Sequence, residues 1–582
     1  MKFNLKSLAL TIGLAILTVT KISEAANAAD YYVRSLPGLP DSLYLKSHAG
    51  HITIDEQSES NIFFWLMHNL HIADNAKLII WLNGGPGCMD GVFLETGPFR
   101  MNKDQTLKPF YGSWNEYANV LYVDQPVGTG FSFTNQYNYV NNVTQIPQQF
   151  LIFLDKFFEI FPEYSQDDLY LAGESFAGTY IPYIANGILK RNYETKTPNN
   201  RKYNLRGIAI GNGWIDPISQ YHSYYDFAIA NKLLDGDNKK LAEAHLKLCN
   251  EALKKSITIK KGECEEILGI ILESSVKRIG KVDTCINQYD IRDHSDSYPY
   301  CGLKWPYELT TIYDYLRRPD VIKDLHATRK KELWVECSST VSARFDGDLS
   351  PPSITLFPEI LKQINVLLFS GDQDIICNYM GTEAMINNLE WNGYKGFQNN
   401  TKLLWYVNNT LAGHIVTERN LTYVKVFNAS HMVPYDVPIV SMDMMYRFMG
   451  LDHHVVNKFQ SKIESEDFDD NKDNLDSEHK DDDEIWNRYY DAGTTTLIIV
   501  IFGVLGLVAF IFRGKIIEKI RNTNQIMKVN TEETNEMENL VIDTQLSGDL
   551  DHFGDSDAEG DDTQKSNSYH QKKYHDEEKD IN

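Results

Sequence analysis

Six short runs of apolar, often β-branched residues recur along the first 430 positions, with helical patterns between them. Uninterrupted apolar runs of this length are typical of strands buried on both faces of a sheet. Strands that alternate with helices predict an α/β fold with a mostly parallel sheet covered on both sides. The runs lie at 78–82, 119–124, 169–173, 206–211, 364–371 and 422–428.

The alternation is interrupted between residues 218 and 340. This stretch is rich in Lys and Glu and has a helical pattern from Leu233 to Lys277. We expect a helical insertion, stapled by disulfides, that covers the active edge of the sheet. Four of its cysteines allow three pairings, among which the sequence does not choose: Cys249, Cys264, Cys285 and Cys301.

Two longer apolar segments predict targeting signals. Lys2 and Lys6 precede an apolar run and a group of small residues, which predicts a signal peptide at 1–28. Residues 494–512 carry no charge and are long enough to cross a bilayer as a helix. A basic cluster follows, so we expect a type I protein whose tail, 513–582, is cytosolic and open to sorting machinery.

The net charge of -24 is concentrated near the C-terminus. Residues 461–491 hold 13 acidic and 4 basic residues, and residues 513–582 hold 17 and 9, so these segments contribute -9 and -8. The body therefore has no basic footprint, and nucleic acid is excluded as a partner. We expect a catalytic domain at 29–452 and a disordered acidic stalk at 453–493.

The extracytoplasmic placement of the body is also indicated by cysteines and sequons. All seven cysteines precede the predicted membrane span, on the oxidising side. Five N-x-S/T sequons also precede it and predict glycosylation at Asn142, Asn399, Asn408, Asn420 and Asn428.

The chemistry is indicated by residues that follow three of the predicted strands. Ser175 lies between a strand and a helix among small residues, as in the turn that exposes a nucleophilic serine. Two candidate carboxylates, Asp372 and Asp374, follow a later strand, and His431 follows the last one. The order serine, acid, histidine predicts an α/β-hydrolase fold with a nucleophilic triad.

Six sequence motifs make the predicted function more specific. They resemble the signature segments of serine carboxypeptidases and span the body from 31 to 450. Within that family, the signal peptide, stalk, single span and tail resemble the fungal pheromone-processing carboxypeptidases, which remove C-terminal Lys and Arg in the late Golgi. The motifs are WLNGGPGC (81–88), DQPVGTGFS (124–132), GESFAGTY (173–180), GNGWIDP (211–217), GDQDIICN (371–378) and HMVPYDVP (431–438).

The resemblance implies catalytic roles. Ser175 would be the nucleophile, His431 the general base and then acid, and Asp374 the residue that orients His431. The backbone amides of Gly85 and Phe176 would form the oxyanion hole.

It also implies binding and structural roles. Asn83 and Glu174 would bind the terminal carboxylate of the substrate, Cys377 would be an unpaired thiol near the pocket, and Met432 would line the pocket for the leaving residue. A disulfide would join Cys88 to Cys337.

Glu174 and the loop after Cys88 bear on specificity. An ionised Glu174 would repel a substrate carboxylate, so binding should favour acidic pH, where His431 also protonates. The loop lacks two small residues that the family usually has before Met89. Asp90 is a candidate for recognising a cationic side chain, although loop aspartates are more often turn formers.

These observations predict a membrane-anchored serine carboxypeptidase of the trans-Golgi network that acts on peptide or protein C-termini ending in Lys or Arg. We find no metal-ligand spacing and no dinucleotide fingerprint, so no cofactor is expected. Three alternatives remain: a broad-specificity carboxypeptidase of the vacuole or lysosome, a catalytically silent receptor or adhesion ectodomain, and an acyltransferase with the same triad.

Overall fold

The computed structural model describes residues 27–465, except 41–42, 44, 86, 88, 136–137, 195–200, 258, 295, 346 and 400. These residues belong to one compact unit, Met1–Asp467. The predicted span and tail, and nearly all of the predicted signal peptide, lie outside the described residues. Within the described part, none of the helices has the length and apolar character to cross a membrane.

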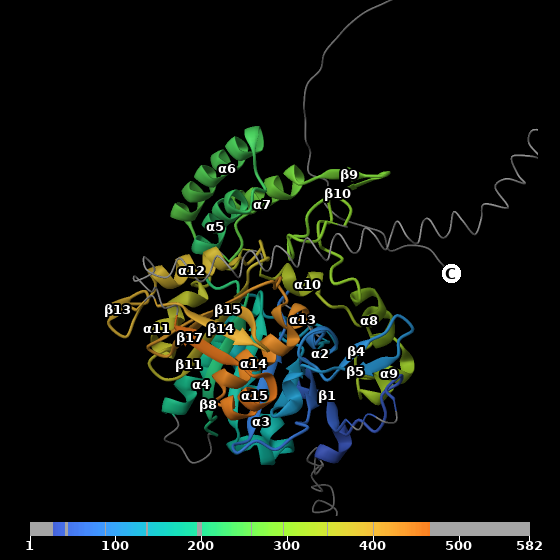
Figure 1. Ribbon diagram of the computed structural model, residues 1–582. Coiled ribbons are helices and arrows are strands. Elements are labelled where there is room, and N and C mark those ends of the chain that lie inside the picture. Colours follow the sequence, from blue (N-terminus) through green and yellow to red (C-terminus); the bar gives the residue numbers. More distant parts are fainter. Residues whose placement is uncertain are drawn as a thin grey trace, which may run out of the picture. The chain divides into compact units, whose positions relative to one another are not determined.

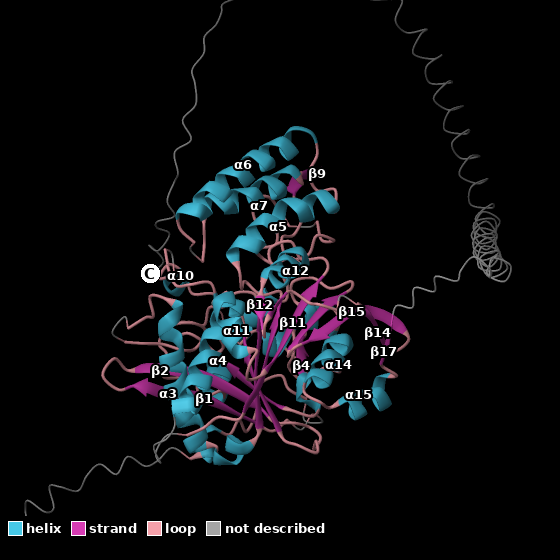
Figure 2. Ribbon diagram, turned by 90° about the vertical axis from the view of Figure 1, so that its left-hand side faces the viewer, coloured by secondary structure: helices cyan, strands magenta, loops and turns pink. Residues whose placement is uncertain are grey.

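An eleven-stranded mixed sheet runs through the body (Figure 2). Its order is β1-β2-β6-β3-β7-β8-β11-β16-β15-β14-β17. The six central strands are parallel, and each corresponds to one of the six predicted runs, so those predictions are confirmed. They are β6 (Asn119–Val123), β3 (Lys77–Leu82), β7 (Asp168–Glu174), β8 (Leu205–Gly211), β11 (Asn365–Gly371) and β16 (Leu421–Val426).

Antiparallel strands extend both edges, so the sheet is mixed and the prediction of a mostly parallel sheet holds only for its centre. Antiparallel neighbours can be joined by tight turns, whereas parallel neighbours need a crossover. Apolar runs separated by helical patterns predict only the parallel strands, so the edge hairpins were not predicted. The edge strands are β1 (Ser47–Asp55), β2 (Ser60–Met67), β15 (Thr410–Glu418), β14 (Leu403–Val407) and β17 (Lys462–Ser465).

Each face of the sheet has its own apolar core. In β3, Ile79 and Trp81 belong to one core, and Leu78 and Ile80 belong to the other, as the two-residue period of a strand requires. The helices α3 (Ile146–Ile160), α4 (Ala177–Glu194) and α11 (Phe357–Ile360) cover the second face. The helices α14 (Pro438–Phe448) and α15 (Asp452–Phe459) cover the first.

The insertion between β8 and β11 has two parts. The helices α5 (Pro217–Ala230), α6 (Gly236–Lys255) and α7 (Gly262–Ser274) form a lobe at one end of the body (Figure 1). The disulfides Cys249–Cys264 and Cys285–Cys301 settle the pairing that the sequence left open. In contrast, α8 (Leu309–Leu316) and α9 (Pro319–Asp324) contribute to the core of the body, so only part of the insertion is a cap.

The folded domain extends beyond residue 452, so the predicted start of the stalk is wrong. Val455 and Phe459 lie one helical turn apart on α15 and are buried. The chain then forms β17, which pairs with β14, and Arg447 donates to Ser461. Charged neighbours conceal this short apolar face in the sequence.

The remaining elements are short or peripheral. They are α2 (Gly91–Leu94), β4 (Phe99–Met101), β5 (Leu107–Pro109), β9 (Lys277–Ile279), β10 (Val282–Thr284), α10 (Ser339–Ser342), α12 (Tyr379–Asn388), β12 (Glu390–Trp391), β13 (Tyr394–Lys395) and α13 (Val433–Asp436), with 3₁₀ turns at Ala28–Tyr31, Trp114–Glu116, Val143–Gln145, Pro162–Gln166 and Ser353–Leu356.

Candidate active site

The register of the central strands brings their carboxyl ends into one row. Leu82 pairs with Gly173, Glu174 pairs with Gly211, and Gly371 pairs with Val426. Polar residues that follow these strand ends therefore meet at one edge of the sheet. They are Asn83 after β3, Ser175 after β7, Asn212 after β8, Asp374 after β11 and His431 after β16.

Ser175 occupies a strained turn between β7 and α4. Its φ of 58° lies in the left-handed region that side-chain-bearing residues rarely adopt, as expected for a nucleophile on a strand-to-helix turn. The loop after β3 passes directly beside it. A Cβ added to Gly84 would come within 2.4 Å of the Ser175 Cβ, so this loop can approach the serine only with glycine there.

His431 is held by a buried carboxylate. Its Nδ1 lies 2.8 Å from Oδ2 of Asp374, which is fully buried. Asp374 also accepts hydrogen bonds from Asn212 Nδ2 at 2.8 Å and from the amides of Ile376 and Cys377 at 3.0 and 3.2 Å. These donors fix the carboxylate, and the carboxylate in turn directs Nε2 of the imidazole outward as a base.

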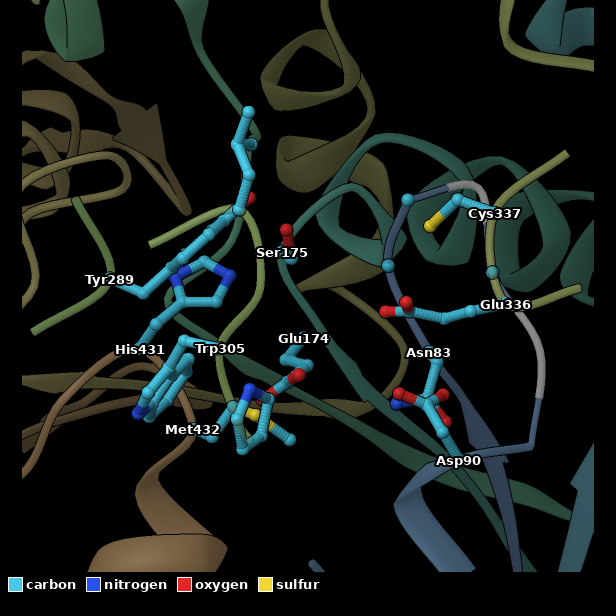
Figure 3. A pocket seen from close by; sticks show the side chains of 15 residues that line it. Asn83, Asp90, Glu174, Ser175, Tyr289, Trp305, Glu336, Cys337, His431 and Met432 are labelled. Carbon is cyan, nitrogen blue, oxygen red and sulfur yellow. The ribbon is translucent and has the colours of Figure 1, made fainter. Parts of the chain in front are cut away.

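Ser175 and His431 line the same pocket, and Figure 3 shows a ring nitrogen of His431 directed toward the serine. Within the described part of the chain, no hydrogen bond joins the two side chains. Such catalytic contacts often tighten only when substrate is bound.

Two cavities meet at Ser175, and both include Gly85 and Tyr289. The first, of about 270 Å³, contains His431, and the second, of about 340 Å³, contains Phe176. A peptide bond placed at Ser175 would therefore have a separate cavity for the residue on each side. Other members of the first lining are Asn83, Asp90, Glu174, Glu336 and Met432; other members of the second are Trp214, Tyr224, Glu265, Ile376 and Cys377.

Glu174 lines the first cavity and is paired with a second buried carboxyl group, that of Glu95. The two groups are within hydrogen-bonding reach of each other, and Asn83 Nδ2 donates to Glu95 at 3.2 Å. Burial raises the pKa of Glu174 well above its ordinary value, and the charge of Glu95 adds to the effect. Burial also raises the pKa of Glu95, to about 7. The pair therefore keeps at least one proton at neutral pH and can donate to a carboxylate.

A second acidic pair, Asp90 and Glu336, lies in the same cavity, and Figure 3 shows the Glu336 carboxyl group pointing into that cavity. Burial raises the pKa of Asp90 well above its ordinary value, and the charge of Glu336 is the next cause. Burial raises the pKa of Glu336 to about 7. A bound cation would favour ionisation of both groups.

The structure brings most of the predicted site residues together. It selects Asp374 over Asp372 as the partner of His431. Cys377 is an unpaired, buried thiol on the second cavity, as expected. Cys88 lies outside the described residues, so its disulfide with Cys337 stays a prediction. A Cβ on Gly85 would lie 2.7 Å from Cys337 Sγ, so this sulfur lies beside the loop that follows β3. The five sequons also stay predictions.

Three residues were missed by sequence interpretation: Asn212, Glu95 and Glu336. Asn212 lies in a quoted motif, but nothing in the motif indicates its contact with Asp374. Glu95 could have been noticed, because it directly follows the apolar residues after Gly91 and a buried carboxyl group needs a partner. Glu336 reaches the cavity from the far end of the insertion, and no local pattern marks it.

Comparisons with known proteins agree with this geometry. A sequence profile described as serine carboxypeptidase matches residues 37–450. A pheromone-processing carboxypeptidase of Aspergillus fumigatus is 44% identical over 531 residues, covering 87% of this chain and 83% of the relative. One of Pyricularia oryzae is 46% identical over 468 residues, covering 78% and 73%.

A solved structure is also similar. The crystal structure of a prohormone-processing carboxypeptidase from Saccharomyces cerevisiae matches with a TM-score of 0.67 and 36% identity, covering 73% of this chain and 96% of that one. The chain belongs to the serine carboxypeptidase family, and it is a serine-type carboxypeptidase.

Proposed function

We propose that this enzyme removes Lys and Arg from the C-termini of processed precursor peptides, with Ser175, His431 and Asp374 as its triad. Ser175 Oγ attacks the carbonyl carbon of the last peptide bond, and its proton passes to His431 Nε2. The amides of Gly85 and Phe176 donate to the developing oxyanion. His431 then protonates the leaving amino group, and water hydrolyses the acyl-enzyme.

The observation that carries an exopeptidase function is the Glu95–Glu174 pair beside the triad. A protonated carboxyl pair together with Asn83 can donate hydrogen bonds to a free C-terminal carboxylate. An internal peptide bond offers no carboxylate at that point, so its binding leaves these buried groups without the partner for which they are arranged. The pair therefore selects the last residue of a chain.

The preference for basic residues is supported by Asp90 and Glu336. Apolar side chains of Leu303, Trp305 and Met432 line the same cavity and can flank the aliphatic stem of Lys or Arg. The two carboxyl groups then face the cationic head. A Leu side chain would leave both carboxyl groups buried without a cationic partner. This costs free energy, so the binding of a C-terminal Leu is disfavoured.

The proposal is tested with matched peptides that differ only in a final Lys, Arg or Leu. We expect a higher kcat/KM for Lys and Arg than for Leu, and a selective loss with Lys in Glu336→Gln, of about tenfold or more, because a buried charged contact contributes about 1.5–3 kcal/mol. Equal losses for Lys and Leu in this variant would show that Glu336 does not recognise the cation. A wild-type preference for Leu would favour the broad-specificity alternative.

The location that we propose is the late secretory pathway, with residues 494–512 as a single anchor and the catalytic domain in the lumen. The similar fungal proteins are described as carboxypeptidases that process pheromones or prohormones, which supports this location. The anchor lies outside the described residues. The test is protease treatment of cells whose plasma membrane is permeabilised while the membranes of the secretory pathway stay intact. We expect the body to be protected and the tail to be digested. Protection of the tail but not of the body would contradict the topology.

A further inference from the structure

A cluster of three potential metal ligands lies on the surface, apart from the triad. Asp74 belongs to the loop after β2, and His453 and His454 are consecutive residues of α15. One ligand atom from each residue lies within 4.8 Å of the other two. Nothing in the proposed reaction uses these residues.

The distance between Asp74 and His453 suits a shared ion. His453 Nε2 lies 3.4 Å from Asp74 Oδ2. A charge-assisted hydrogen bond would bring such atoms to about 2.7–2.9 Å. Two ligands that each lie about 2.0–2.1 Å from a tetrahedral ion are about 3.3–3.4 Å apart. The observed distance therefore matches an edge of a metal tetrahedron better than a direct bond.

His454 provides the second observation. Its Nε2 is buried and has no hydrogen-bond partner among the described residues. The imidazole stacks on Tyr117 with ring centres 4.4 Å apart and an interplanar angle of 25°, so its orientation is set by packing.

We propose that Asp74, His453 and His454 bind a Zn²⁺ ion, with water as the fourth ligand. Two imidazoles and one carboxylate are a common zinc donor set, whereas Mg²⁺ and Ca²⁺ prefer oxygen ligands. The ion would tie α15, near the C-terminal end of the folded domain, to a loop from its N-terminal part. Because the site exists only in the folded protein, the ion stabilises the native state by mass action.

The direct test is zinc binding to the purified full-length protein after removal of metals with a chelator. We expect one Zn²⁺ to bind at this site and to raise Tm, and Mg²⁺ to do neither. Asp74→Asn and His454→Phe should each weaken this binding by about tenfold or more and abolish the rise in Tm. Phe keeps the stacking on Tyr117, and Asp74 is 83% exposed, so both variants should fold; equal Tm values in chelator check this.

Two controls make the outcome decisive. His245→Ala, on the distant helix α6, should bind zinc like wild type. The triad region holds a second group of possible ligands, Asp374, Cys377 and His431, and Cys377→Ala separates zinc bound there from zinc at the surface. Zinc affinity and stoichiometry that stay unchanged in Asp74→Asn and His454→Phe would overturn the proposal, as would the absence of zinc binding in wild type.

Discussion

Replacing Glu95 with Gln tests how the enzyme recognises a free C-terminus. The ordinary pKa of a glutamate is 4.5, and burial raises that of Glu95 to about 7. At about 1.4 kcal/mol per pKa unit, ionising Glu95 in this site is disfavoured by ~3 kcal/mol relative to water. Below pH 7 the Glu95–Glu174 pair is therefore neutral, and above it the pair carries a negative charge that faces the substrate carboxylate.

The sign of the expected effect follows from this charge. In wild type, KM for a peptide with a free C-terminus should rise above pH 7 by about tenfold per pH unit, because each unit lowers the protonated fraction of Glu95 tenfold. In Glu95→Gln, the amide keeps a donor but cannot ionise, and the remaining Glu174 has a pKa well above its ordinary value. The variant should therefore match wild type near pH 5 and keep a low KM to a higher pH.

The assay is the pH dependence of KM, measured between pH 5 and 9 with peptides that end in a free carboxylate. The same peptide with an amidated C-terminus, measured as a competitive inhibitor, serves as the control, because it offers no carboxylate and its inhibition constant should not follow the charge of the pair. The reasoning is refuted if KM of Glu95→Gln rises in parallel with that of wild type. It is also refuted if the amide control shows the same rise.

Two further predictions concern stability and one concerns the triad. Burial raises the pKa of Asp124 to about 7, so the native state of wild type loses stability as pH rises from 5 to 7. Asp124→Asn should therefore gain about 2 kcal/mol relative to wild type over this range in denaturant unfolding, and a constant difference would contradict this. A chain ended after Ser465 should remain folded and active, whereas one ended after Leu451 should have a lower Tm, because it loses α15 and β17; equal Tm values would show that these elements add nothing. Asn212→Ala should lower kcat more than it raises KM, because the amide holds Asp374 and does not line either cavity, and an unchanged kcat would remove it from the positioning of the triad.

The parts of the fold that could be predicted from sequence share a physical cause. Strands buried on both faces, such as β3 and β11, require uninterrupted apolar runs, and chemical residues that follow parallel strands must converge at one edge. The order of Ser175, Asp374 and His431 along the chain could therefore be predicted from the sequence. The hairpin strands at the edges were not, because a tight turn leaves no helical pattern between them.

The parts that could not be predicted depend on contacts between distant segments. Glu95 follows α2 and Glu174 ends β7, so they become a proton-sharing pair only when these two segments pack together, and neither residue shows this locally. Glu336 reaches the first cavity from the end of a long insertion. Disulfide pairing within the insertion also required the three-dimensional positions of Cys249 and Cys264.

The most direct test of the central claim is mass spectrometry of a peptide ending in Lys-Arg during incubation with the full-length enzyme. We predict stepwise loss of Arg and then Lys, with no internal cleavage, and no loss from the same peptide with an amidated C-terminus. Ser175→Ala, which keeps the fold but has no nucleophilic hydroxyl, should release neither residue. Internal cleavage, loss from the amidated peptide at the same rate, or near-normal release by Ser175→Ala would contradict a serine carboxypeptidase that works through Ser175 and reads the terminal carboxylate.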